Sequence, residues 1–212
     1  MIKLYGIPLS NYTNMVKTAL IEKAIPFEMV SIRPSQDASY LTKSKMGKVP
    51  CIETEDGFLA ETHPILDYLE ELKPQPALLP STAFERAKVR ELVQTLELYV
   101  EVVAHKGIGF MFGRPVPEEV KASMKSDLPR GVAAVGRLAR FSPWIAGPQF
   151  TYADLFGYYT FSLANLSAKK NVEMDLVTML PGAEEWLQRV GARDSIKKAN
   201  ADMAEARAAL QR

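Results

Sequence analysis

The sequence predicts two structural parts, an α/β domain at residues 1–78 and an all-helical domain at residues 84–212. Short strand-like runs and helical stripes follow one another up to residue 72, which is typical of an α/β arrangement. Residues 73–80 then contain three prolines, and a stiff connector of this kind marks a domain boundary. From Phe84 onward the strand signals disappear and long helical stripes replace them.

The first elements are predicted to be a strand, a helix and a second strand. Residues 2–5 alternate between apolar and polar side chains, and Gly6 and Pro8 end the run. An apolar stripe at helical spacing follows, with Thr13 or Asn14 as the expected N-cap. Residues 27–32 form the second strand, and the helical crossover between the two strands predicts a parallel pair.

A short helix, a hairpin and a longer helix complete the first domain. Residues 34–46 have weak helical spacing. The dipeptide Asp56-Gly57 separates two short apolar runs, and both residues tolerate the positive φ of a tight hairpin turn. The next helix is expected to begin with Thr62 as its N-cap and Pro64 in its first turn.

The second domain is predicted to be a helical bundle. Thr151 and Asp154 have the spacing of a capping box, and Phe150 is expected to pack on Leu155 as the hydrophobic staple. The long apolar stripes suit helices that bury one face against their neighbours. The expected helices are residues 84–106, 118–140, 151–165, 182–190 and 195 to the end.

Composition excludes several functional classes. Lys plus Arg number 26 and Asp plus Glu number 25, so the net charge of +1 gives no broad field for nucleic acid or an anionic membrane. One cysteine, Cys51, excludes an internal disulfide framework, and we expect it to pack as a small apolar side chain. No run is long enough for a membrane span and no signal segment is evident, so we expect a cytoplasmic protein.

Three motifs resemble the cytosolic glutathione transferases, of the serine-type, bacterial-like kind. Residues 47–50 read Gly-Lys-Val-Pro, residues 61–62 read Glu-Thr, and residues 144–154 match the family pattern W-[LI]-x-G-x-x-[FY]-[TS]-x-A-D. The resemblance implies a thioredoxin-like, glutathione-binding first domain and a second, helical domain that carries the electrophile pocket. It also implies that Val49-Pro50 is a cis peptide.

The resemblance assigns a glutathione site to the first domain. A proline at the head of a strand has no N–H, so the main chain there can pair with an extended peptide. The free N–H groups of the following helix suit a carboxylate. The glutathione-binding residues implied are Lys48, Val49, Pro50, Glu61, Thr62 and His63. No metal is expected, because two histidines and one cysteine make no zinc pattern.

Ser10 is the expected catalytic residue. The attacking species is a thiolate, and a free thiol is mostly protonated at neutral pH. Ser10 lies in the loop after the first strand, where the resemblance places the catalytic serine of serine-type classes. Asn11, Thr13 and Tyr5 are further candidates for activating the thiol.

The remaining site assignments are weaker. Glu97 is expected to reach the glutathione of the partner subunit in a homodimer, or else to belong with Glu101 to a solvated helix face. The side chains expected to line the electrophile pocket are Asn11, Tyr12, Phe110, Met111 and Phe112. The aromatic residues and methionine among residues 110–112 would otherwise be core residues.

Three functions follow from the resemblance. The first is conjugation of glutathione, as co-substrate, to a small hydrophobic electrophile. The second is a glutathione-dependent cis-trans isomerase of the maleylacetoacetate type, and the third is a low-turnover protein that binds glutathione or apolar ligands. The natural electrophile does not follow from the sequence.

Overall fold

The computed structural model describes residues 1–209 and divides into two compact units. Unit 1 comprises Met1–Leu78 together with the chain from Ala192 onward, and unit 2 comprises Leu79–Gly191. The mixed sheet and helical bundle confirm the predicted fold class. The predicted domain division at residues 78 and 84 remains a prediction, and nothing in the sequence indicates that the last helix packs with the first unit.

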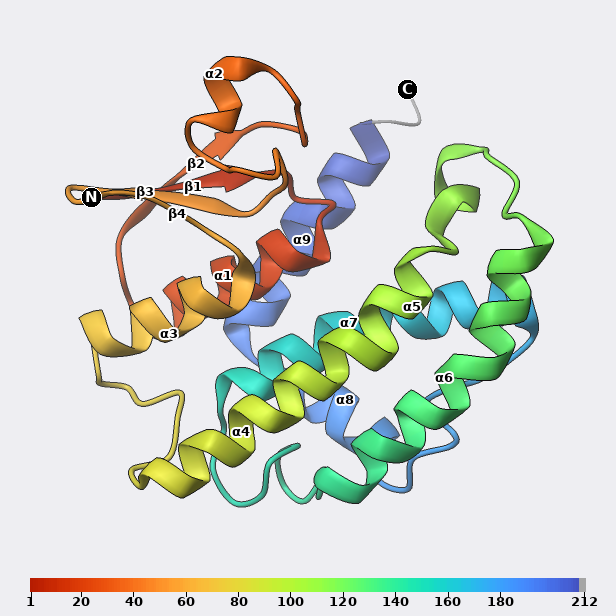
Figure 1. The fold of residues 1–212 in the computed structure, drawn as a ribbon. Helices are drawn as coiled ribbons and strands as arrows, with labels where there is room; N and C mark the ends of the chain where they lie inside the picture. The colour runs from red at the N-terminus through yellow and green to blue at the C-terminus, as the bar shows by residue number, and fades with distance from the viewer. Residues whose placement is uncertain (210–212) are drawn as a thin grey trace. The chain divides into compact units, whose positions relative to one another are not determined.

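Unit 1 is built on a four-stranded sheet of order β2-β1-β3-β4 (Figure 1). Its strands are β1 (Ile2–Gly6), β2 (Phe27–Ser31), β3 (Cys51–Thr54) and β4 (Gly57–Ala60). The strands β1 and β2 are parallel, as the crossover predicts, whereas β3 is antiparallel to both β1 and β4. The hairpin turn lies at Glu55 and Asp56, one residue earlier than expected, and Gly57, with a φ of 131°, is the first residue of β4.

Different helices pack on the two faces of this sheet (Figure 1). The helices α1 (Asn11–Glu22) and α3 (Thr62–Leu72) pack together on one face. On the other face Tyr5 and Cys51 form a cluster with Tyr40 of the short helix α2 (Ala38–Leu41). Cys51 is fully buried, as predicted, and burial raises the pKa of its thiol to about 11.

Several sequence expectations for unit 1 were wrong in detail. Helix α1 begins at Asn11 with Ser10 as its N-cap, so neither Thr13 nor Asn14 caps it. Only the four residues of α2 are helical within residues 34–46, where Pro34 and a polar stretch disfavour a longer helix. Strand β2 ends at Ser31, one residue early.

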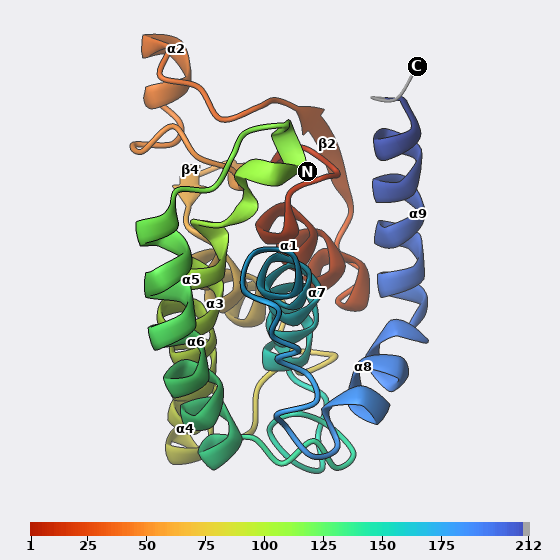
Figure 2. The ribbon, with the colours of Figure 1, turned by 90° about the vertical axis from the view of Figure 1, so that its right-hand side faces the viewer.

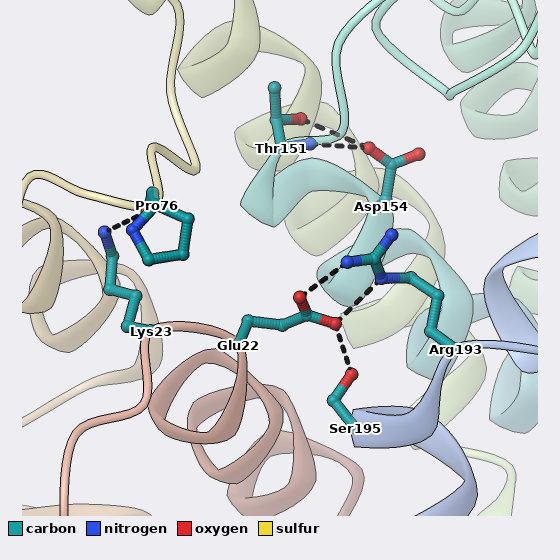
Figure 3. Close-up of polar contacts among 7 residues, drawn as sticks. All are labelled: Glu22, Lys23, Pro76, Thr151, Asp154, Arg193 and Ser195. Carbon is teal, nitrogen blue, oxygen red and sulfur yellow. Dashed lines mark hydrogen bonds and ion pairs between the residues drawn. The ribbon is translucent and has the colours of Figure 1, made fainter.

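Helix α9 (Asp194–Ala209) packs on α1 within unit 1 (Figure 2). The Arg193 guanidinium binds both carboxylate oxygens of Glu22, with Nε–Oε1 2.8 Å and Nη2–Oε2 2.6 Å (Figure 3). Burial raises the pKa of Glu22, but hydrogen bonds from Arg193 and Ser195 outweigh burial and hold this pKa below its ordinary value. Lys17 of α1 also pairs with Asp202 of α9.

A buried ion pair fixes the segment that leaves α3. The Lys23 side chain is fully buried, and its Nζ lies 2.6 Å from Glu70 Oε2. The same Nζ donates to the Lys73 carbonyl oxygen at 2.7 Å. It also donates to the Pro76 carbonyl oxygen at 2.9 Å (Figure 3). Glu70 Oε2 also accepts from the Leu78 N–H at 3.0 Å. Every member of this network has partners, which is the condition under which a buried ion pair is tolerated.

Unit 2 is a helical bundle around α7 (Figure 2). Helix α7 is buried along most of its length because α4, α5, α6 and α8 all pack on it. The helices are α4 (Ala83–Leu96), α5 (Val102–His105), α6 (Glu118–Leu138), α7 (Tyr152–Val172) and α8 (Ala183–Gly191). A single helix was expected over residues 84–106, but a π-helical segment, η1 (Glu97–Glu101), interrupts it. A Cβ on Gly131 of α6 would lie 2.0 Å from the Tyr99 carbonyl oxygen, so this contact requires glycine.

The predicted capping box at the start of α7 is confirmed. The Thr151 N–H donates to Asp154 Oδ2 at 2.9 Å (Figure 3). Asp154 Oδ1 also accepts from the Ile145 N–H and from the Trp186 indole Nε1, each at 2.8 Å. One buried carboxylate therefore ties together the loop before α7, the first turn of α7 and α8. The expected contact of Phe150 with Leu155 remains a prediction, and Phe150 stacks edge-on against Trp144 at 4.9 Å between ring centroids.

Candidate functional site

Three segments of unit 1 meet at one edge of the sheet. Tyr5 pairs with Cys51 and Cys51 pairs with Ala60, so these residues form one row across β1, β3 and β4. Strand β4 runs parallel to β1, because both are antiparallel to β3. The chain therefore leaves β1, enters β3 and leaves β4 at this edge. The predicted residues carried by these three segments are Ser10, Lys48, Val49, Pro50, Glu61, Thr62 and His63.

Ser10 lies in a tight turn between β1 and α1. Its N–H donates to the Ile7 carbonyl oxygen at 3.0 Å, and its Oγ accepts from the Thr13 N–H at 3.2 Å as the N-cap of α1. Because Oγ accepts this bond, the hydroxyl proton is directed to another acceptor. A hydroxyl polarised in this way, beside the positive end of a helix dipole, suits an anionic sulfur.

The Tyr5 hydroxyl binds the Glu53 carboxylate within the sheet. This hydroxyl is the donor, and Tyr5 is 8% exposed. The hydrogen bond to Glu53, and then burial, raise the pKa of Tyr5 to about 12. In the same pair, the bond from Tyr5 and then the bond from Lys3 lower the pKa of Glu53. The geometry therefore favours the sheet role of Tyr5 over thiol activation.

Asn11 and Thr13, which the sequence also offers for thiol activation, lie in the first turn of α1. Thr13 is fully buried and packs against Gly6, where an added Cβ would lie 2.4 Å from Thr13 Oγ1. Asn11 and its neighbour Tyr12 are half-buried. Ser10 thus combines partial exposure with the N-cap position, whereas Thr13 is enclosed by the loop it supports.

The Val49-Pro50 peptide is cis, as the resemblance implied. The loop before it is held by two side chains: the Tyr40 hydroxyl donates to the Lys48 carbonyl oxygen at 3.0 Å, and Ser44 Oγ accepts from the Lys48 N–H at 3.1 Å. Val49 itself packs on the cluster that contains Tyr40. The main chain at the head of β3 is therefore fixed before any ligand is present.

Glu61, and not Thr62, occupies the N-cap position of α3. Its φ of 71° and ψ of 129° are uncommon for a residue with a side chain, and its own carboxylate makes no capping bond. Such a conformation costs on the order of 1–3 kcal/mol and is concentrated at functional sites. Thr62 is buried in the first turn. The prediction that Thr62 caps this helix was wrong because the chain enters the helix through Glu61.

Two further predicted contacts lie beside these segments. His63 is half-buried, with Nε2 3.9 Å from Asp67 Oδ2, one turn further along α3. The Lys48 side chain is exposed at the start of the loop into β3. Their roles in binding glutathione remain predictions.

In unit 2 the three predicted pocket residues belong to a 3₁₀ segment, η2 (Ile108–Phe112). None of them is buried: Met111 is 41% exposed and Phe112 is 63% exposed, while Phe110 is half-buried. The expectation that they might instead be core residues is therefore wrong. Their part in an electrophile pocket remains a prediction.

A buried acid lies next to Glu97 in the π-helical segment. Glu97 is half-buried at its start, but Glu101 is fully buried, so the two do not form a solvated face. Glu101 Oε1 lies 3.1 Å from His105 Nδ1. Sequence reasoning missed this pair, although the spacing of four residues on a helix would have indicated it. The contact of Glu97 with the glutathione of a partner subunit remains a prediction.

The part of the chain that the structure describes contains neither a metal cluster nor a membrane-spanning helix. Among residues 1–209, no three His, Cys, Asp or Glu side chains are grouped to hold a metal ion. Within the same residues, no helix has both the length and the apolar character needed to cross a membrane.

Comparison with known proteins identifies the family. Residues 4–77 match the model "Glutathione S-transferase, N-terminal domain", and residues 102–202 match "Glutathione S-transferase, C-terminal domain". A protein of Pseudomonas putida named "Glutathione S-transferase" is 43% identical over 203 residues, covering 95% of this chain and 92% of that protein. The chain belongs to the glutathione S-transferase family.

Two further matches are less similar to this glutathione transferase. The "Maleylacetoacetate isomerase" of Pseudomonas aeruginosa is 26% identical over 163 residues, covering 73% of this chain and 77% of that protein. The solved structure of glutathione transferase F2 from Populus trichocarpa superimposes with a TM-score of 0.82 at 22% identity, over 97% of this chain and all of that one. This structural likeness confirms the fold.

Proposed function

We propose that this glutathione transferase binds glutathione at the sheet edge formed by the segments around Ser10, Val49-Pro50 and Glu61-Thr62. The observation that carries the proposal is the row Tyr5, Cys51 and Ala60, which brings the three segments to one edge. Each segment supplies a different group: a polarised hydroxyl, a fixed extended main chain and a helix N-terminus. These groups match the thiol, the peptide backbone and the carboxylate of glutathione.

The peptide part of glutathione is assigned to the main chain at Val49. A strand that begins after a proline leaves main-chain groups at its edge for an extended ligand. The γ-glutamyl carboxylate is assigned to the Thr62 hydroxyl and the first N–H groups of α3, and its ammonium to Glu61. Lys48 is assigned to the glycine carboxylate as a point charge. His63 lies beside this set on α3.

Ser10 is assigned to the sulfur. Its hydroxyl donates a hydrogen bond to the thiolate, which stabilises the charged form by about 1.5–3 kcal/mol, or roughly one to two pKa units. The proton of the thiol leaves to solvent when the thiolate forms. The thiolate then attacks an electrophilic carbon, a sulfur–carbon bond forms, and the leaving group departs with the electron pair of the broken bond.

Isomerisation is the second candidate function. It is favoured by the isomerase of Pseudomonas aeruginosa, which covers 73% of this chain at 26% identity. In that reaction the same thiolate would add to a carbon–carbon double bond, allow rotation about the resulting single bond, and leave again. The Ser10 site therefore serves both candidates, and only the second substrate distinguishes them.

The test is a pair of activity assays on the purified protein. Glutathione conjugation to an aromatic halide would support the transferase, and cis-trans isomerisation of a maleyl compound, dependent on glutathione, would support the isomerase. Binding of glutathione by calorimetry with neither activity would support the low-turnover binding protein. Absence of glutathione binding would contradict the assignment of this sheet edge.

A further inference from the structure

The Asn14 side chain connects helix α1 to the loop that carries Ser10. Asn14 is fully buried, and its Nδ2 donates to the Pro8 carbonyl oxygen at 2.7 Å. Its main-chain N–H donates to the Ser10 carbonyl oxygen at 3.0 Å. A carbonyl oxygen can only accept, so the amide nitrogen of Asn14 must face Pro8. One residue therefore holds two carbonyl groups on either side of the Leu9–Ser10 peptide.

These two bonds restrict the direction of the Ser10 hydroxyl. The turn at residues 7–10 is closed by the bond from the Ser10 N–H to the Ile7 carbonyl oxygen. On the side of helix α1, the Thr13 N–H donates to Ser10 Oγ at 3.2 Å. Of these hydrogen bonds, the one from Asn14 Nδ2 to the Pro8 carbonyl oxygen spans the most residues, and it fixes the turn relative to the helix. We propose that Asn14 is a positioning residue that aims the Ser10 hydroxyl at the glutathione sulfur.

Helix α9 also contacts the Asn14 carboxamide. Met203 Sδ lies 3.9 Å from Asn14 Nδ2, so the nitrogen has contacts both to the Pro8 carbonyl and to α9. The Lys17–Asp202 ion pair joins the same two helices one turn further along. The C-terminal helix thereby restricts the rotamer of Asn14, and through it the loop of Ser10.

This inference rests on the proposed role of Ser10 as the donor to the sulfur. A hydrogen bond donated by Ser10 lowers the pKa of the bound thiol only if the hydroxyl is correctly directed. A residue that directs it should change that pKa without touching glutathione. Asn14 should therefore affect the thiol through Ser10 and leave the binding of the peptide at Val49 and Thr62 unchanged.

The experiment measures the pH dependence of kcat/KM for glutathione conjugation. The variants are Asn14→Leu, which removes the amide at similar volume, and Asn14→Ala, which removes the amide and adds no titratable group. Each should lower kcat/KM at neutral pH about fivefold, the effect of one neutral hydrogen bond, and should raise the apparent pKa of the bound thiol. The KM for glutathione should stay near that of the wild type, because its contacts are elsewhere.

The matched control is Thr18→Val, one turn along the same buried face. The Thr18 hydroxyl bonds to the Asn14 and Met15 carbonyl oxygens, at 2.7 and 3.0 Å. Thr18→Val should lower the melting temperature without moving the pH profile. Asn14→Leu could instead lose stability while its pH profile of kcat/KM coincides with that of Thr18→Val. Asn14 would then be a structural residue only, and the inference would be overturned.

The double variant Ser10→Ala/Asn14→Leu separates this inference from the proposed function. If Asn14 acts through Ser10, adding Asn14→Leu to Ser10→Ala should cause no further shift in the profile. An equal shift in both backgrounds would show that Asn14 acts independently and would refute the inference alone. If Ser10→Ala itself left the profile unchanged, the proposed role of Ser10 would fail first, and the positioning role would fail with it. Where Asn14→Leu does not fold, Asn14→Ala gives the same comparison.

Discussion

The carboxylate of Asp154 accepts a hydrogen bond from the Trp186 indole at 2.8 Å inside unit 2. Burial raises the pKa of Asp154 to about 6, although four hydrogen bonds favour its charged form. The charged carboxylate therefore links the loop before α7, the first turn of α7 and helix α8. Burying its charge costs free energy.

The first prediction concerns Asp154→Asn. The amide offers one acceptor oxygen to the four donors that converge on the carboxylate, so the variant should lose about 1–3 kcal/mol of unfolding free energy at pH 7. Because the folded pKa lies above the unfolded one, the contribution that comes from this shift is present below the unfolded pKa and is lost as pH rises through about 6. The difference in stability between wild type and variant should grow by about 1 kcal/mol from pH 7 to pH 5. Urea denaturation at both pH values measures it, and a difference that shrinks toward pH 5 would contradict the raised pKa.

The second prediction concerns Ser10. Ser10→Ala should raise the pKa of the bound thiol by about one to two units and lower kcat/KM some 10–100-fold at neutral pH. Activity should recover partly at high pH, where hydroxide in solution removes the thiol proton. The loss of the N-cap should also cost about 1 kcal/mol of stability.

Ser10→Asp separates the cap from the catalytic role. An aspartate keeps a cap acceptor for the Thr13 N–H but has no proton to donate at neutral pH, and its charge opposes a thiolate. We expect wild-type stability with low activity. A pH-rate profile of Ser10→Ala that coincides with the wild type would move the assignment to Asn11 or Thr13.

The third prediction compares Glu61→Ala with Glu61→Gly. Both remove the carboxylate assigned to the glutathione ammonium, so both should raise the KM for glutathione tenfold or more, at about 1.4 kcal/mol per decade. Only glycine adopts a φ of 71° without strain, so Glu61→Gly should be more stable than Glu61→Ala by about 1 kcal/mol or more. Steady-state kinetics and thermal unfolding measure the two effects. A change only in the KM of the electrophile would place the glutathione site elsewhere.

The fourth prediction concerns the attachment of α9 to α1. Arg193→Met leaves the half-buried Glu22 without its bidentate partner, so the pKa of Glu22 should rise. Since the folded pKa of Glu22 is lowered in the wild type, its stabilising contribution exists above the unfolded pKa and is lost as pH falls. Arg193→Met should therefore reduce stability most at neutral pH, and less in acid. Lys197→Met is the matched control, because its pair with Asp194 is exposed at 3.7 Å and should change stability little.

The fifth prediction is a homodimer, which the family resemblance implies. Sedimentation equilibrium at micromolar concentration should give twice the chain mass of 23.6 kDa. If only the single-chain mass were found, a contact of Glu97 with glutathione in a partner subunit would be impossible.

Local chemistry accounts for the parts of the fold that the sequence predicts well. The hairpin near Asp56-Gly57 and the capping box of Thr151 and Asp154 depend on neighbours within three residues, so the sequence predicts both, although the hairpin turn falls one residue earlier than expected. The N-cap of α1 was misassigned because Ser10, Thr13 and Asn14 all have capping side chains. Which of them caps the helix depends on how the loop leaves β1.

Long-range contacts account for what the sequence does not predict. Lys23 meets partners about fifty residues away in the chain, and Glu22 meets Arg193 at a separation of 171 residues. Nothing near Asn14 indicates that its side chain faces Pro8 and Met203 rather than capping the helix. The three motifs of the candidate site could be predicted from the sequence, whereas the long-range contacts that hold these motifs in place could not.

The buried Lys23 ammonium has a consequence for cutting this chain into pieces. Its hydrogen-bond acceptors include the main-chain oxygens of Lys73 and Pro76, which lie inside the proline-rich connector. A fragment that stopped at the end of α3 would leave a buried cation without those oxygens, and an under-coordinated buried charge costs several kcal/mol. Residues 73–78 of the connector thus belong to the first unit. A fragment or fusion junction should lie beyond Leu78, whose N–H completes the coordination of Glu70.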